Sequence, residues 1–337
     1  MSQRRRPAVA ASRAVLSPEG GGTVADLERP DRRRPLDGGA APPTRRRWLK
    51  REHALAYLLL APLVLIMLLV IGYPVVNTLW LSLTNMAIIG SPSSFVGLDN
   101  YLTVLQDERF WASLGRSVVW LIGNTIAVTV LAFGAALLLN RGGWIARRAR
   151  IWLMFPWVIP TVAVAIIWQW LLNSNYGVVN YLLQAVGVLT APLNVFGAPA
   201  AALAGLILVN AWHWFPLSAV ILFGALQTIP EEVYEAAKVD GANPWQTFWR
   251  ITFPLLGKVL FALGLVGTLW TFNIVDTIYL ITKGGPADAS MTAPIYIYDQ
   301  AFKAFHASQA AAASVLSIVA LALFAALYIR FARPKEA

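Results

Sequence analysis

The sequence lacks the features that would mark a common enzyme. None of its 337 residues is cysteine, which excludes disulfides and thiolate metal sites. It contains no G-x-x-x-x-G-K-[ST] phosphate-binding loop and neither the G-x-S-x-G nor the H-E-x-x-H pattern of hydrolases. His213 has only two other histidines in the chain and no acidic cluster beside it, so no metal site is predicted. We therefore expect no catalysis, and no cofactor or metal held by this chain.

Charged residues are also scarce. Only 13% of residues are charged and 58% are hydrophobic, whereas soluble domains have about 25% and about 45–50%. The net charge is nevertheless +10. An apolar but basic chain is typical of an integral membrane protein. The alternative is a soluble core with a nucleic-acid-binding tail.

The positive charge is concentrated in residues 1–52. This segment holds 13 Lys and Arg against 6 Asp and Glu, and it is rich in proline, glycine and serine. It cannot bury enough apolar surface to fold alone. Runs of arginine can neutralise phosphates, but we expect a disordered cytoplasmic tail that holds the first membrane helix in place and binds no nucleic acid. Residues 53–337 then form the membrane domain.

Six apolar stretches are long enough to cross the hydrocarbon core, which takes about 20 helical residues. They cover 54–83, 117–139, 151–172, 199–226, 255–281 and 309–331. The predicted fold class is all-α, a polytopic membrane protein with six transmembrane helices. Pro216 is expected to break the fourth helix locally. Tryptophans near the ends of the stretches are expected to anchor at the membrane interface; they include Trp111, Trp120, Trp144 and Trp170.

The connections between these stretches differ in charge. The tail, loop 140–150, segment 228–258 and the C-terminal end together carry 23 Lys and Arg, while the three other loops carry 4. Connections rich in Lys and Arg stay in the cytoplasm. Both termini are therefore predicted to be cytoplasmic.

Segment 228–254, between the fourth and fifth stretches, has the pattern of two short helices. Pro230 suits a first helical position, and acidic residues follow it at the positive helix end. Gly241 stands where a left-handed residue would end the first helix. Asn243 is placed to cap the second helix, and Gln246 completes a capping box. Small residues at the bend leave room for another surface to approach closely.

The same segment carries a motif with fixed spacing. It contains, in order, Glu235-Ala236-Ala237, Gly241, Ile251 and Pro254. This motif resembles the EAA signature of binding-protein-dependent ABC importer permeases. In that family the element is the coupling helix, which docks on the ATP-binding subunit; where the family usually has leucine before the last proline, Phe253 stands here. The resemblance implies ATPase coupling through Glu235, Ala236, Ala237, Asp240, Gly241, Ile251 and Pro254.

Further segments extend the resemblance over nearly all of the chain after residue 54. They are 95–101, 156–160, 175–180, 272–273, 282–286 and 311–314. In this order they look like sugar permeases of the maltose and trehalose type. The resemblance implies the type I ABC importer permease fold in a bacterial cytoplasmic (inner) membrane. It also implies a second homologous permease subunit, two ABC ATP-binding subunits that hold ATP and Mg, an extracytoplasmic sugar-binding protein and a sugar substrate as partners.

Few polar residues lie within the apolar stretches. Asp276 is predicted inside the fifth, where a carboxylate is costly and suggests a function, with Asn273 on the same helical face. Resemblance to the maltose permeases directs six residues toward the substrate cavity: Asn210, His213, Trp214, Phe272, Asn273 and Asp276. The structural alternatives are that Asp276 pairs with an arginine of a partner chain or lies near the outer face, and that the asparagines only join helices.

Together these features predict a permease subunit of an ATP-driven sugar importer. It would form half of the pathway for a neutral di- or oligosaccharide and work by alternating access. Glycerol-3-phosphate or another polyol is the alternative substrate, but the spans offer no Lys or Arg for a phosphate except Lys258 and Arg330, which lie at their ends. The alternative from another class is a six-span channel or membrane enzyme that works alone.

Overall fold

The computed structural model describes residues 45–88 and 90–332. Most of the predicted tail, residues 1–52, lies outside the described residues. Its last part, 45–52, forms the first turns of helix α1 (Arg45–Met67). The chain divides into two units, Met1–Leu63 and Val64–Ala337, and each is described by itself. In the first unit, α1 is the one described element.

All regular secondary structure in the described residues is helical, as predicted. Four helical segments are long and apolar enough to cross a membrane: Leu55–Ser82, Glu108–Asn140, Pro199–Leu226 and Ala307–Ala332. Two bent pairs also qualify if each pair counts as one span: Ala146–Val158 with Thr161–Leu171, and Pro244–Leu255 with Gly257–Phe272. The six predicted stretches are therefore matched when both bent pairs cross.

The third predicted span is broken. It consists of α5 (Gly143–Leu153), α6 (Phe155–Val158) and α7 (Thr161–Leu171), and the chain turns by 98° at residues 159–160. The residue before a proline is pushed out of the helical region, and Ile159, which precedes Pro160, is extended with ψ 130°. A break at this position therefore follows from local sterics.

Two π-helical turns precede prolines within helices. η1 (Leu68–Gly72) leads into α2 (Tyr73–Ser82), and η2 (Phe248–Thr252) leads into α12 (Phe253–Leu255). The second residue of α2 is Pro74 and that of α12 is Pro254. Proline has no N–H for the carbonyl four residues earlier and its ring crowds that carbonyl. A wider π turn at this place lets the helix continue.

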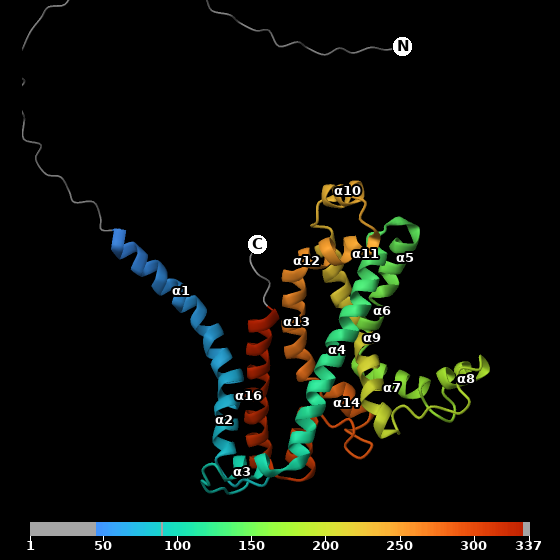
Figure 1. Ribbon diagram of the computed structural model, residues 1–337. Coiled ribbons are helices and arrows are strands. Elements are labelled where there is room, and N and C mark those ends of the chain that lie inside the picture. Colours follow the sequence, from blue (N-terminus) through green and yellow to red (C-terminus); the bar gives the residue numbers. More distant parts are fainter. Residues whose placement is uncertain (1–44, 89, 333–337) are drawn as a thin grey trace, which may run out of the picture. The chain divides into compact units, whose positions relative to one another are not determined.

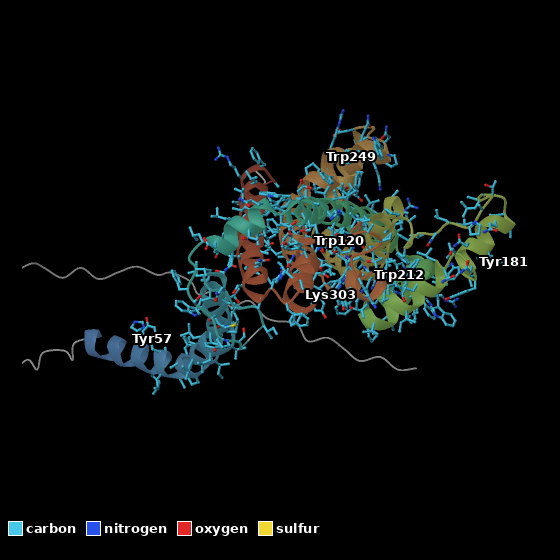
Figure 2. All side chains as sticks on the ribbon, turned by 90° about the horizontal axis from the view of Figure 1, so that it is seen from below. Tyr57, Trp120, Tyr181, Trp212, Trp249 and Lys303 are labelled. Atoms are coloured by element: carbon cyan, nitrogen blue, oxygen red, sulfur yellow. The ribbon has the colours of Figure 1, made fainter. Side chains whose placement is uncertain are left out.

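The centre of the second unit is the pair α4 (Glu108–Asn140) and α9 (Pro199–Leu226), which pack along each other (Figure 1). Pro216 lies buried within the continuous helix α9, so the predicted local break is wrong. Trp120 on α4 is 1% exposed, and its Nε1 donates to the Thr271 carbonyl at 2.9 Å. It lies inside the bundle (Figure 2) and is not an interface anchor. The other tryptophans named as expected anchors, Trp111, Trp144 and Trp170, are exposed.

The two ends of this unit carry different elements (Figure 1). At one end lie α10 (Glu231–Val239), α11 (Pro244–Thr247), α5 and the C-terminal end of α16 (Ala307–Ala332). At the other end lie α3 (Asp99–Gln106) and α14 (Asp276–Ile281). The predicted loops thus contain short helices, which also include α8 (Val178–Ala185), α15 (Ala293–Tyr298) and η3 (Asp299–Lys303).

Candidate functional site

The segment with the EAA-like motif folds as two short helices at one end of the bundle, as its proline, glycine and capping residues predict. α10 has Pro230 as its N-cap residue, one position earlier than predicted, and two glutamates in its first turn. It ends at Val239, and the chain then turns at Gly241, whose φ of +76° is the left-handed conformation that glycine adopts at least cost. The Ala242 N–H then donates to the Ala237 carbonyl at 2.9 Å and closes the turn.

The second helix is fixed by a capping box. Asn243 Oδ1 accepts from the Gln246 N–H at 2.8 Å, and Gln246 Oε1 accepts from the Asn243 N–H at 2.9 Å. The chain then passes through η2 and α12 into α13 (Gly257–Phe272), with a bend of 66°. The relative orientation of α10 and α11 is therefore set by local hydrogen bonds.

One side of this segment is anchored to the bundle. Ala237 is buried, and Tyr234 Oη lies 3.3 Å from Thr252 Oγ1, which joins α10 to η2. The Phe248 ring packs edge-on against Phe133 of α4 at 5.5 Å between centroids. A displacement of α10 and α11 would therefore be transmitted to α4 and to the start of α13.

The other side of the segment is exposed and includes apolar side chains. Val239, the last residue of α10, is 88% exposed, and Trp245 and Trp249 are also exposed; Figure 2 shows Trp249 at the edge of the bundle. Most motif residues share this exposure: Glu235, Ala236, Asp240, Gly241 and Pro254 are exposed, Ile251 is half-buried and Ala237 is buried. Sequence reasoning missed Val239 and Trp245, although an apolar residue just before the C-terminal glycine of an otherwise polar helix was a visible signal.

Two of the six expected cavity residues are polar side chains that lie buried between helices. Asn210 is 1% exposed, and its Nδ2 donates to Asn124 Oδ1 on α4 at 2.7 Å. His213 is 4% exposed, and its Nε2 lies 3.1 Å from the Ile159 carbonyl at the break of the third span. Both side chains join α9 to neighbouring elements in this structure.

The four other expected residues lie around the end of α13. Trp214 is half-buried, and its ring centroid lies 6.3 Å from that of Trp270. α13 ends at Phe272, and Asp276 begins a separate helix, α14, so Asn273 and Asp276 do not share one helical face as predicted. Both are exposed. In the described part of the chain, no cationic side chain lies within 4.0 Å of the Asp276 carboxylate.

Phe272 faces a different region from the polar residues near it. It is buried against Leu121 and Ala293. It also lines a cavity of about 220 Å³ between α4, α13 and α16, together with Leu114, Ser117, Val118, Leu121, Ala320, Leu321, Leu323, Phe324 and Leu327. Ser117 is the one polar residue of this set, and its Oγ is already bonded to the Ala293 N–H at 2.7 Å. Such a cavity does not have the hydrogen-bonding groups that a sugar requires.

A polar network at the opposite end of the unit was not foreseen. Arg109 Nε lies 2.9 Å from Asp288 Oδ2, and Arg109 Nη2 lies 3.7 Å from Asp299 Oδ2. Lys303 Nζ lies 2.9 Å from Asp299 Oδ1, and this hydrogen bond raises the pKa of Lys303. The network ties the first turn of α4 to the segment between α14 and α16.

Tyr296 strengthens the same connection. Its hydroxyl donates to Asp107 Oδ2 at 2.5 Å, and its ring packs edge-on against Phe110. Burial and this hydrogen bond raise the pKa of Tyr296. The partners are up to 189 residues apart in sequence, so no local pattern indicates these contacts.

No group of three or more His, Asp or Glu residues that could hold a metal ion occurs in the part of the chain that the structure describes.

Known proteins match this chain over most of its length. Residues 113–335 match the family described as binding-protein-dependent transport system inner membrane component. The trehalose/maltose transport system permease protein MalF of Thermococcus litoralis is 32% identical over 84% of this chain and 95% of its own. The diacetylchitobiose uptake system permease protein DasB of Streptomyces coelicolor is 33% identical over 90% of this chain and 94% of its own.

A solved structure shows the same fold. A chain of a bacterial ABC transporter involved in the import of the acidic polysaccharide alginate superposes with a TM-score of 0.74 and 21% identity, over 87% of this chain and 100% of that chain.

Proposed function

The chain belongs to the family of binding-protein-dependent transport system inner membrane components and is a permease component of an ABC sugar importer, and on this premise we propose that segment 228–254 couples it to an ATP-binding subunit. A permease subunit is not itself an enzyme, and membership of the family implies a substrate-binding protein as a partner. ATP and Mg would be held by two ATP-binding subunits, and a second homologous permease would complete the pathway.

The observation that supports coupling is that one side of the segment packs on the bundle while the other side is exposed. Ala237 and Phe248 anchor it to the bundle, while Val239 and Trp245 stand exposed in a membrane protein at an end that carries several charges. An exposed apolar side chain on a rigid turn is suited to enter a groove on a partner. Movement of the partner would then reach α4 through the contact of Phe248 with Phe133.

A charge reversal tests this role. In the assembled importer, Glu235→Lys is expected to abolish sugar uptake while the chain remains in the membrane and keeps its thermal stability, because Glu235 is exposed. Glu108→Lys is the matched control, since it reverses an exposed carboxylate at the other end of the unit. Normal uptake by Glu235→Lys, or equal loss in both variants, would show that the segment does not couple.

We further propose that the end with α10 and α11 faces the cytoplasm of a bacterial inner membrane, as the Lys and Arg distribution indicates. Because the chain has no cysteine, single-cysteine variants report topology without background. Two exposed residues serve as labelling positions: Val239, the last residue of α10, and Val186, the C-cap residue of α8. A membrane-impermeant maleimide applied outside spheroplasts should label Val186→Cys alone. Labelling of Val239→Cys instead would show that the end with α10 and α11 faces away from the cytoplasm.

For the pathway we propose Trp214, Asn273 and Asp276 as the residues of this chain that meet substrate, because they are exposed or half-buried near the break after α13. Asn210, His213 and Phe272 are buried and would position the helices that line the pathway without touching substrate. A free carboxylate repels acidic sugars, so Asp276 favours a neutral di- or oligosaccharide. Asp276→Asn should lower uptake and Asp276→Arg should abolish it, at unchanged membrane level; equal uptake by all three would remove Asp276 from the pathway.

The substrate class can be tested separately from this chain. The cognate sugar-binding protein should bind a neutral disaccharide more tightly than a uronic acid oligomer or glycerol-3-phosphate in a calorimetric titration. Preference for either anionic ligand would refute the neutral substrate and leave the coupling proposal untouched.

A further inference from the structure

Helix α5 has two different faces and lies at the same end as α10 and α11 (Figure 1). It follows a turn in which Gly142 and Gly143 both have positive φ, +71° and +82°. Ala146 is buried, and Leu153, two turns later on the same side, packs into the apolar cluster that also contains Phe248 of the coupling segment. This side of α5 is part of the bundle.

The opposite side of α5 is basic and aromatic. Trp144 and Trp152 are 66% and 71% exposed, and Arg147 and Arg148 are exposed between them. The Arg148 guanidinium lies over the Trp144 ring, 5.1 Å from its centroid, a cation–π geometry in which the ring face attracts the charge. Ile151, also exposed, adds an aliphatic side chain to this face.

The cations of this face lack an acidic partner within the described chain. No carboxylate oxygen there lies within 4.0 Å of Arg147 or Arg148. Arg150 is placed differently, since its guanidinium lies 4.6 Å from the Phe223 ring of α9 and so belongs to the bundle side. The outer face therefore combines two uncompensated guanidinium groups with indole rings.

We propose that this face of α5, which comprises Trp144, Arg147, Arg148, Ile151 and Trp152, binds the headgroups of anionic phospholipids. Guanidinium groups form charge-assisted hydrogen bonds with phosphate. Tryptophan settles at the level of the headgroups, and helices with basic and aromatic residues lie in that layer. Because Leu153 shares an apolar cluster with Phe248, the lipid contact would also steady α5 against the coupling segment.

The test measures lipid preference of the full-length chain in mixed micelles. Quenching of tryptophan fluorescence by brominated phosphatidylglycerol is compared with quenching by brominated phosphatidylcholine, for wild type and for the double variant Arg147→Gln/Arg148→Gln. Each surface arginine near anionic lipid contributes about fivefold in affinity at low salt, so the double variant should lose roughly 25-fold of the phosphatidylglycerol preference. Trp144→Phe should remove part of the quenching signal itself.

The matched control removes equal charge at the same end of the chain. Arg250→Gln/Lys258→Gln neutralises one cation on η2 and one on α13, both exposed, and should keep the preference. Equal losses in both double variants, or no preference in wild type, would overturn the proposal. Displacement of the lipid by inorganic phosphate at constant ionic strength would overturn it in favour of a free-anion site.

A protein occupant is the remaining outcome. If Arg147→Gln/Arg148→Gln leaves the lipid preference unchanged but weakens co-purification of the ATP-binding subunit, this face belongs to the ATPase contact and the lipid proposal is wrong.

Discussion

The exposed valine at the tip of α10 permits a quantitative test of docking. Val239→Ala removes two methyl groups from a side chain that is 88% exposed, so folding should change by less than about 0.5 kcal/mol. If docking buries Val239 in a groove, each lost methyl costs about 0.8 kcal/mol of binding. The sum, about 1.6 kcal/mol, corresponds to about 15-fold weaker affinity for the ATP-binding subunit.

The assay is the dissociation constant of the purified ATP-binding subunit on nanodiscs that carry both permease subunits. Val186→Ala is the control, since Val186 is 71% exposed at the C-cap of α8, far along the chain from the coupling segment. Affinity should fall for Val239→Ala only, with equal melting temperatures for all three proteins. Unchanged affinity of Val239→Ala, or an equal fall in the control, would refute the docking of this side chain.

Three further substitutions test local contacts by thermal inactivation in detergent. Gly241→Ala should cost about 1–2 kcal/mol from left-handed strain alone, since nothing lies within 4 Å of the added Cβ; an unchanged melting temperature would contradict the turn geometry. Tyr296→Phe removes the hydroxyl that donates to Asp107 and should cost about 1–3 kcal/mol. The pKa of Tyr296 is raised in the folded state, so the folded protein keeps this proton at a pH where the unfolded chain loses it. Wild-type stability should therefore fall as pH rises above 10.0, the pKa of an unperturbed tyrosine, and it should fall less in Tyr296→Phe. Equal pH profiles of the two proteins would contradict this role of the hydroxyl. Asn210→Ala strands Asn124 and should cost about 0.6–2 kcal/mol with uptake retained, whereas loss of uptake at unchanged stability would place Asn210 in the pathway.

Local sequence patterns were sufficient for part of the fold. Hydropathy located the membrane helices, and the capping box at Asn243 and the left-handed Gly241 were predicted from residue types, because each depends on neighbours within four residues. The break before Pro160 follows a local steric rule too, but its angle of 98° depends on the packing of α6 and α7 on other helices. Hydropathy averages over a window and does not register such a bend.

Contacts between distant residues were not predictable. The pairing of Arg109 with Asp288 joins residues 179 apart. Trp120 lies in an apolar stretch like an interface tryptophan, but it is buried in a cluster of residues from other helices, where the Thr271 carbonyl accepts from its indole N–H. The position of Asp276 was mispredicted for a related reason: hydropathy continues through residues 273–275, while the helix ends at Phe272.

Four of the polar side chains within the apolar stretches donate to backbone carbonyls where a helix ends or breaks. Inside a bilayer, backbone carbonyls freed by a break need a donor from the protein itself. Gln169 Nε2 donates to the carbonyls of Leu280 and Ile281 at the end of α14, at 3.0 and 2.8 Å. Asn273 Nδ2 donates to the Leu269 carbonyl at 2.9 Å near the end of α13.

His213 at the Ile159 carbonyl and Trp120 at the Thr271 carbonyl follow the same rule. Each of these four side chains supplies a donor where a helix ends or breaks. For Gln169, His213 and Trp120 this accounts for the polar group without a ligand, whereas Asn273 is also exposed and stays a pathway candidate. Asp276 is the exception, because a carboxylate has no proton to give a carbonyl; its Oδ1 accepts from the Thr277 N–H at 2.9 Å, and the side chain is exposed. That N–H belongs to the first turn of α14, where a carboxylate is favoured by the helix dipole, so the start of the helix accounts for one of its two oxygens. A neutral side chain could accept the same hydrogen bond, and binding of a hydroxylated substrate, as proposed above, would account for the charge. Asp276 is therefore the residue whose substitution should alter transport without altering the fold.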